Sequence, residues 1–147
     1  RRFNPCEYLI NNHKLARVEV IRDLGVLIDS SLRFDKHIDN IIKKVSAISK
    51  LILLSFSTRD QNILKKAFCS YVRPILEYGS PVWNPHRKLL IDRIERVQKR
   101  FTKAIPCLRL HPYMKILKLL NLHSLEKRRL LESTNSYYNS SRRYKLL

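Results

Sequence analysis

A stripe of basic residues is the pattern in this sequence best suited to contact a polyanion. Its members fall three and four positions apart, so that a helix would place them along one side: Arg93, Arg96, Arg100 and Lys103, with Lys99 adjacent. Arginine forks match phosphate oxygens, and such a stripe can follow a phosphate backbone. The alternative is a solvated helix face in which acidic neighbours pair with the cations: Asp92 with Arg96, and Glu95 with Lys99. The acids are too few to neutralise the stripe, which slightly favours nucleic acid.

A second basic cluster consists of Lys127, Arg128 and Arg129. We expect it in the first turn of the last helix, where cations oppose the helix dipole. That unfavourable placement hints at an external anion and makes Arg128 and Arg129 candidate nucleic-acid contacts. Three solvated surface cations are the alternative reading.

Residues suited to catalysis or metal binding are sparse. The carboxylates are scattered, and no pair is placed to converge on two metal ions. Cys107 and His111 are four residues apart, which fits one corner of a zinc site with His123 as a distant third ligand, but no further Cys or His completes it. The sequence also lacks a glycine-rich phosphate loop. We therefore predict no catalytic residue, no metal and no cofactor in this chain.

The high positive charge of the chain limits the kinds of partner that it is expected to bind. The 147 residues carry a net charge of +18, of which +14 falls on residues 58–147. A domain this basic usually meets nucleic acid or an anionic membrane surface. No apolar run approaches the roughly 18 residues of a membrane span, so we expect nucleic acid and no membrane. The three scattered cysteines, Cys6, Cys69 and Cys107, predict reduced, buried thiols of an intracellular protein.

A crowded corner is predicted over residues 71–85, which hold three of the six prolines, one of the two glycines and the only tryptophan. Pro74 should kink or restart a helix, and Gly79 offers the left-handed conformation that closes one. Asn84 followed by Pro85 predicts the N-cap and first residue of the next helix. A large ring between these helices could pin one against the other. The residues assigned to this corner are Pro74, Tyr78, Gly79, Trp83 and Pro85.

The apolar spacing elsewhere predicts mainly helix. One stripe begins at Phe34 and continues through Ile38, Ile41, Val45, Ile48 and Ile52. A capping box at Thr58 and Gln61 opens a second helix, whose predicted buried positions are Leu64, Phe68, Tyr71 and Ile75. A third helix buries Leu90, Ile94, Val97, Phe101 and Ala104 or Ile105, and ends at Pro106. A short helix covers residues 113–120, and Ser124 caps a last one whose polar end, residues 139–143, should fray.

Residues 6–29 are the plausible sheet, with two or three short antiparallel strands. Asn11 and Asn12 predict a turn, and residues 24–28 an apolar strand in which Gly25 marks a bulge or a close backbone approach. Because so small a sheet is marginal alone, it must lean on helices or on another part of the protein. The predicted fold is mainly α: a bundle of four to five helices preceded by a small antiparallel β element.

Several motifs, in order, resemble the region that follows the palm in reverse transcriptases of non-LTR (LINE-type, jockey/CR1-like) retrotransposons. They are Asp23-Leu24-Gly25-Val26 with residues 29–38, Val72-Arg73-Pro74-Ile75-Leu76-Glu77-Tyr78-Gly79 with Val82-Trp83-x-Pro85, residues 94–101, and residues 124–129. The resemblance covers roughly residues 6–135. It implies that residues 1–33 end the palm, 34–105 form a thumb-like bundle, and 106–147 form a helical linker with a frayed tail.

The resemblance also implies roles. Leu24 and Gly25 would belong to the hairpin that grips the primer end, and the stripe on the third helix would face an RNA–DNA or DNA duplex. The family's catalytic aspartates, with their Mg²⁺, lie in the palm, upstream of this sequence. We therefore expect the chain alone to be inactive, to partner the palm and fingers of the same polyprotein, and to be nuclear within the full retrotransposon protein.

Two functions remain open at this point. The first is a C-terminal fragment of an RNA-directed DNA polymerase that holds primer–template. The second is a stand-alone, non-catalytic nucleic-acid-binding or interaction module derived from a retrotransposon. A third possibility is that the chain belongs to a decayed retrotransposon and has no activity.

Overall fold

The computed structural model describes the backbone of residues 8–143 and the side chains of residues 8–135. The chain is mainly α-helical, as the sequence predicts. Two β-hairpins come first, β1 (Leu9–Ile10) with β2 (His13–Lys14) and β3 (Val20–Asp23) with β4 (Val26–Asp29). The helices are α1 (Asp35–Ser55), α2 (Gln61–Ala67), α3 (Arg73–Glu77), α4 (Ser80–Trp83), α5 (Lys88–Lys103), α6 (Tyr113–Leu119) and α7 (Leu125–Arg143).

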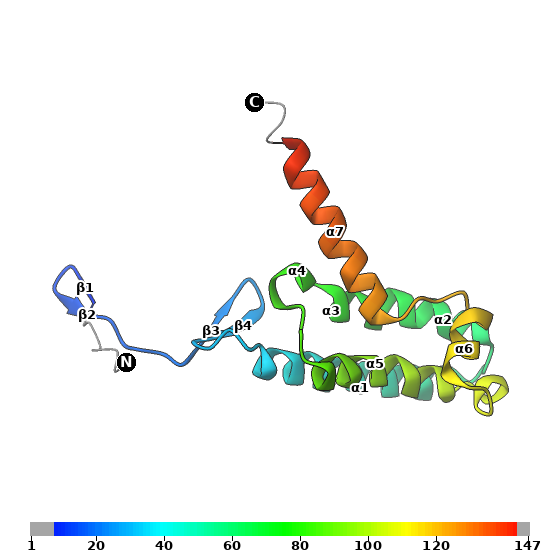
Figure 1. Ribbon diagram of the computed structural model, residues 1–147. Helices are drawn as coiled ribbons and strands as arrows, with labels where there is room; N and C mark the ends of the chain where they lie inside the picture. Colours follow the sequence, from blue (N-terminus) through cyan, green and yellow to red (C-terminus); the bar gives the residue numbers. More distant parts are fainter. Residues whose placement is uncertain (1–7, 144–147) are drawn as a thin grey trace.

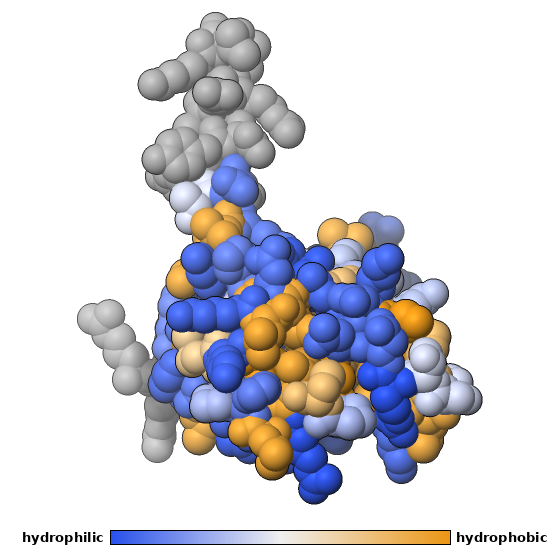
Figure 2. All heavy atoms as spheres, turned by 90° about the vertical axis from the view of Figure 1, so that its right-hand side faces the viewer, coloured by the Kyte–Doolittle hydropathy of each residue, from blue (hydrophilic) through white to orange (hydrophobic). Residues whose placement is uncertain are grey.

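Helices α1 and α5 lie side by side and form the base of the bundle, with α2 and α3 beside them (Figure 1). Helix α7 packs its first turns on α4 and α5, and the rest of it projects away from the bundle. The hairpin β3–β4 lies at one end of α1, whereas β1–β2 lies away from the helices (Figure 1). Apolar surface is exposed at the opposite end, where α6 lies (Figure 2).

Both hairpin turns use left-handed backbone. Asn11 and Asn12 have φ of 49° and 60°, so the predicted turn is confirmed. Leu24 and Gly25, with φ of 44° and 86°, form the turn between β3 and β4. The predicted strand over 24–28 is therefore confirmed for residues 26–28, whereas Leu24 and Gly25 form the turn, because positive φ at two successive residues reverses the chain; Gly25 does not form the bulge that was one of its two predicted roles.

The β3–β4 hairpin leans on α1, as expected of so small a sheet. Val26 is buried in the core, and the backbone N–H of Leu27 donates to Nδ1 of His37 at 3.3 Å. His37 is itself buried and meets the ring of Trp83 edge-on, with 5.3 Å between centroids. One histidine thus links the sheet, α1 and the corner.

The predicted stripe of α1 is confirmed, since Ile38, Ile41, Val45 and Ile52 are buried. The start of α2 differs from the prediction. Asp60, not Thr58, caps it and accepts hydrogen bonds from the N–H groups of Asn62 and Ile63 at 2.8 and 3.0 Å. Asp60 immediately precedes the first helical residue, which is the position from which a side-chain oxygen reaches these amides.

A π-helical turn, Phe68–Val72, joins α2 to α3 without a break. Arg73 donates its N–H to the carbonyl of Phe68, five residues back, and the wider turn admits Pro74 within the run. The turn also moves the buried face from Tyr71 to Val72. Tyr71 is 63% exposed, so its predicted burial is wrong. Leu64 and Phe68 are buried as predicted, whereas Val72 and Leu76 are the next core positions in place of Tyr71 and of Ile75, which is only half-buried.

The corner holds its tryptophan as predicted. Gly79 is left-handed with φ of 65°, and Trp83 is 1% exposed, with Nε1 donating to the carbonyl of Tyr78 at 2.8 Å. The predicted helix start at Asn84 is wrong, because α5 begins at Lys88. The Asn84 side chain accepts from Nε of Arg129 at 3.3 Å instead.

The rest of the helical prediction largely holds. Leu90, Ile94, Val97, Phe101 and Ile105 are buried, and Ala104 is exposed. Ser124 caps α7, where its Oγ accepts from the N–H of Lys127 at 3.2 Å. Helix α7 extends to Arg143, and the fraying expected of residues 139–143 stays a prediction. Cys107 is exposed and Cys69 only half-buried, contrary to prediction, while Cys6 lies outside the described residues.

Candidate nucleic-acid interface

A groove of about 550 Å³ lies between α1 and α5. We name it the α1–α5 groove. Its lining residues come from α1, the segment after it, and α5: Ile42, Ser46, Ser49, Lys50, Leu53, Leu54, Arg59, Arg93, Arg96, Val97, Arg100 and Phe101. The groove combines an apolar floor with five cationic side chains and contains no carboxylate among its lining residues.

The groove lies along the line where α1 and α5 pack together, and both helices contribute cationic side chains to its edge. The apolar stripes of α1 and α5 face each other, and the residues next to each stripe border the groove. On α5 these neighbours are Arg93, Arg96 and Arg100, three members of the predicted basic stripe. The three arginines thus lie on one side of α5, as their spacing in the sequence predicts.

Arg96 and Arg100 are exposed. Among the residues that the structure describes, no carboxylate lies within ion-pair distance of either of them, or of Lys99 and Lys103. The predicted pairs within α5 do not form. Asp92 pairs with Lys88 at 3.4 Å instead. Unneutralised arginine forks beside a groove are suited to phosphate oxygens.

Arg93, by contrast, is already occupied by a partner within the chain. It forms a hydrogen-bonded ion pair with Asp39 of α1. Lys99 and Lys103 are exposed but do not line the groove. Of the five predicted members of the stripe, the structure therefore brings Arg96 and Arg100 to the groove as free cations and Arg93 as a paired one.

Lys50 and Arg59 complete the cationic rim and were missed in the sequence. Lys50 lies on α1 next to buried Ser49, and Arg59 follows that helix in the loop before α2. The available signal was the spacing Ile42, Ser46, Ser49 and Leu53, a second helical face beside the core stripe. Arg59 carries no such periodic signal, since only the loop conformation brings it to the groove.

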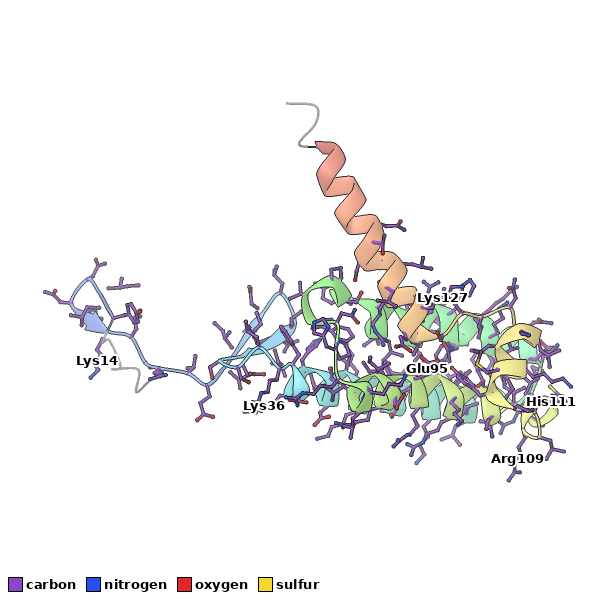
Figure 3. The ribbon with its side chains drawn as sticks, viewed as in Figure 1. Lys14, Lys36, Glu95, Arg109, His111 and Lys127 are labelled. Atoms are coloured by element: carbon purple, nitrogen blue, oxygen red, sulfur yellow. The ribbon has the colours of Figure 1, made fainter. Side chains whose placement is uncertain are left out.

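The other side of α5 anchors α7 through Glu95, which lies between the two helices (Figure 3). One carboxylate oxygen accepts from the hydroxyl of Tyr113, and the other from the N–H groups of Leu125 and Glu126 at 2.9 and 3.4 Å. A carboxylate at a helix N-terminus satisfies unpaired amides and the helix dipole. Burial and then the negative charge of Glu95 raise the pKa of Tyr113 above its ordinary value. Glu95 therefore has a structural task, not the predicted pairing with Lys99.

Arg128 is half-buried and ion-paired and Arg129 is buried, so neither of these predicted nucleic-acid contacts presents a free guanidinium on the surface. Arg128 donates from Nε and Nη2 to the two carboxylate oxygens of Glu77, and this hydrogen bonding raises its pKa. Arg129 is 1% exposed, and burial lowers its pKa. Within the described part of the chain, its two terminal nitrogens find no hydrogen-bond acceptor. The packing of α7 on α4 and α3 buries Arg129 and leaves Arg128 half-buried.

Leu24 and Gly25 lie at the exposed tip of the β3–β4 hairpin, away from the groove. Leu24 is 84% exposed, and its carbonyl accepts from the hydroxyl of Tyr78 at 3.0 Å. The hairpin tip and the corner are thus in direct contact. Pro85 is buried in the corner, whereas Pro74 is exposed on the helix.

Neither a metal centre nor a membrane span is visible in residues 8–143. No three His, Cys, Asp or Glu residues of the described chain lie close enough to hold an ion together. None of the helices described there has the length and apolarity needed to cross a bilayer.

Comparison with known proteins shows that the chain is similar to a protein of a nematode. An uncharacterized protein of Caenorhabditis elegans is 28% identical over 122 residues, which cover 81% of this chain and 62% of the relative. The chain thus spans less than two thirds of that protein's length. No protein-family model matches the chain, and no solved structure matches it.

Proposed function

We propose that this chain binds the sugar–phosphate backbone of duplex nucleic acid through the α1–α5 groove. The supporting observation is the rim of that groove, where Lys50, Arg59, Arg96 and Arg100 surround a surface that no carboxylate lines. Charge–phosphate contacts of this kind give affinity without reading sequence. The net charge of +18 adds a long-range attraction that speeds association.

We further propose that the chain is the thumb and linker region of a non-LTR retrotransposon reverse transcriptase and holds primer–template. The motifs around the Leu24–Gly25 turn and the corner support this proposal. So does the contact of Tyr78 with Leu24, which joins two of those motifs. In the proposal, the catalytic aspartates and Mg²⁺ belong to a palm in the same polyprotein, and the complete protein acts in the nucleus.

Salt dependence tests the binding proposal. With about four phosphate contacts, log K plotted against log salt for a DNA or RNA–DNA duplex should have a slope near roughly −3 to −4. Unrelated duplex sequences should bind equally well, because the proposed contacts reach no base edge. A slope near zero, or strong sequence selectivity, contradicts the proposal.

A primer-extension assay separates the two forms of the proposal. Joined to its palm, the chain should support templated extension with Mg²⁺ and nucleotides, and substitution of Arg96 should reduce extension length. If duplex binding is present but the palm-containing protein never extends a primer, the stand-alone binding module is the better assignment.

A further inference from the structure

The α1–α5 groove has an apolar floor, which backbone phosphates alone would leave unused. Leu53 and Leu54 of α1 and Val97 of α5 are among its lining residues, and Leu54 is 72% exposed. A volume of about 550 Å³ falls within the range that sites for small organic ligands occupy. A phosphate group fills only a fraction of it. The groove is therefore shaped for an anion that carries an apolar, ring-sized part.

The charge of the rim restricts the occupant to anions. Arg93 is neutralised by Asp39, but Lys50, Arg59, Arg96 and Arg100 have no carboxylate partner in the described chain. Three of these four are arginines, whose planar forks can bind phosphate bidentately and also stack on a flat ring. This combination suits a nucleotide better than it suits the carboxylates of an acidic peptide.

Ser49 supplies an independent observation. Its side chain borders the groove and is only 8% exposed, yet within residues 8–135 its hydroxyl has no hydrogen-bond partner. A buried hydroxyl without a hydrogen-bond partner lowers the stability of the fold, and a ligand atom that bonded it would remove this penalty. The oxygen itself is sealed just beneath the apolar lining of the groove, so it can bond the polar edge of a base once the side chains above it shift.

We infer that the groove holds one unpaired nucleotide, with its phosphate on Arg96, Arg100 and their neighbours and its base on the floor beside Ser49. The inference rests on the proposed function and sharpens it: the chain would hold duplex by its backbone and capture a single unpaired base at the end or junction of that duplex. Such capture on apolar side chains is tolerant of base identity.

A matched pair of DNA substrates tests this inference. One is a duplex with a single unpaired nucleotide at the end, and the other is the same duplex with an abasic residue there, so that both carry equal phosphate. The substrate with the base should bind about fivefold to 150-fold more tightly, the range for stacking of one base. A 2-aminopurine in the unpaired position should also change its fluorescence on binding.

Two serine variants localise the effect. Ser49→Ala should reduce the preference for the base-containing substrate by about twofold to tenfold, the worth of one hydrogen bond. Ser55→Ala, on an exposed position of the same helix, should leave it unchanged. Equal affinity for the two substrates overturns the inference, and if salt-dependent duplex binding persists, the proposed function survives. If neither substrate shows salt-dependent binding, the inference and the proposed function are both refuted. Displacement of the base-containing substrate by polyglutamate as readily as by single-stranded DNA also overturns the inference, in favour of an acidic protein partner.

Discussion

Asp39 of α1 and Arg93 of α5, 54 residues apart in the sequence, form an ion pair that joins the two helices beside the groove. The pair bridges α1 and α5 and leaves Arg93 without a free charge for a ligand of the groove. Because its side chains are 45% and 36% exposed, water and salt screen it.

We therefore predict a small coupling between these residues. A double-mutant cycle with Asp39→Asn and Arg93→Gln, measured by urea unfolding, should give an interaction free energy of about 0.2–1 kcal/mol. High salt should reduce it further. A coupling of several kcal/mol would mean that the pair, rather than the apolar stripes, holds α1 against α5.

Trp83 tests whether the corner is a packing element. Trp83→Ala should lower the free energy of unfolding by about 3–5 kcal/mol, because the ring is buried against His37 and Gly79. Trp83→Phe keeps an aromatic ring but loses the hydrogen bond to Tyr78, which should cost less. Unchanged stability with weakened nucleic-acid binding would instead make Trp83 a contact residue.

Glu95 should matter more for stability than its neighbour Glu126. Glu95→Ala leaves the hydroxyl of Tyr113 and the first amides of α7 without their acceptor and should cost about 1.5–3 kcal/mol. Glu126→Ala removes a weak, exposed ion pair with Lys88 and a long-range attraction to Arg129, and should cost less than about 1 kcal/mol. Equal costs for the two variants would show that α7 is not anchored through Glu95.

We predict that the buried His37 makes the folded chain less stable at mildly acidic pH. Burial lowers its pKa from the ordinary 6.5, so the folded chain binds the proton less readily than the unfolded chain. The contribution of neutral His37 to the free energy of unfolding is fully present above pH 6.5. It falls as the pH drops from 6.5 through the lower pKa that His37 has in the folded chain. Urea unfolding of His37→Gln between neutral and acidic pH should show a weaker decline than the parent. Parallel declines would assign the pH dependence to other groups.

The regular helices could be predicted from sequence because each carries its own signal. The spacing of Ile38, Ile41, Val45 and Ile52 gives α1 its face, and Ser124 marks the start of α7 regardless of the rest of the fold. The corner glycine was predictable for the same local reason, since Gly79 tolerates φ of 65°.

The sequence predictions failed where the local structure depends on the wider fold, including contacts between residues far apart in the sequence. The π turn at Phe68–Val72 shifts the buried face by one residue, and no spacing rule for an ordinary helix anticipates it. Arg128 and Arg129 look like a surface cluster until Glu77 and Asn84, about fifty residues earlier, are placed beside them. The far wall of the groove was hidden for the same reason.

Arg96 gives the most direct measurement of the central claim that the α1–α5 groove contacts phosphates. The salt dependence of duplex binding should be measured for the parent chain, for Arg96→Ala, and for Arg109→Ala, whose exposed side chain points away from the helices (Figure 3). We predict that Arg96→Ala reduces the slope of log K against log salt by about one, with no change in sequence preference, and that Arg109→Ala does not. An unchanged slope for Arg96→Ala, or equal reductions for both variants, would contradict the groove as the nucleic-acid interface.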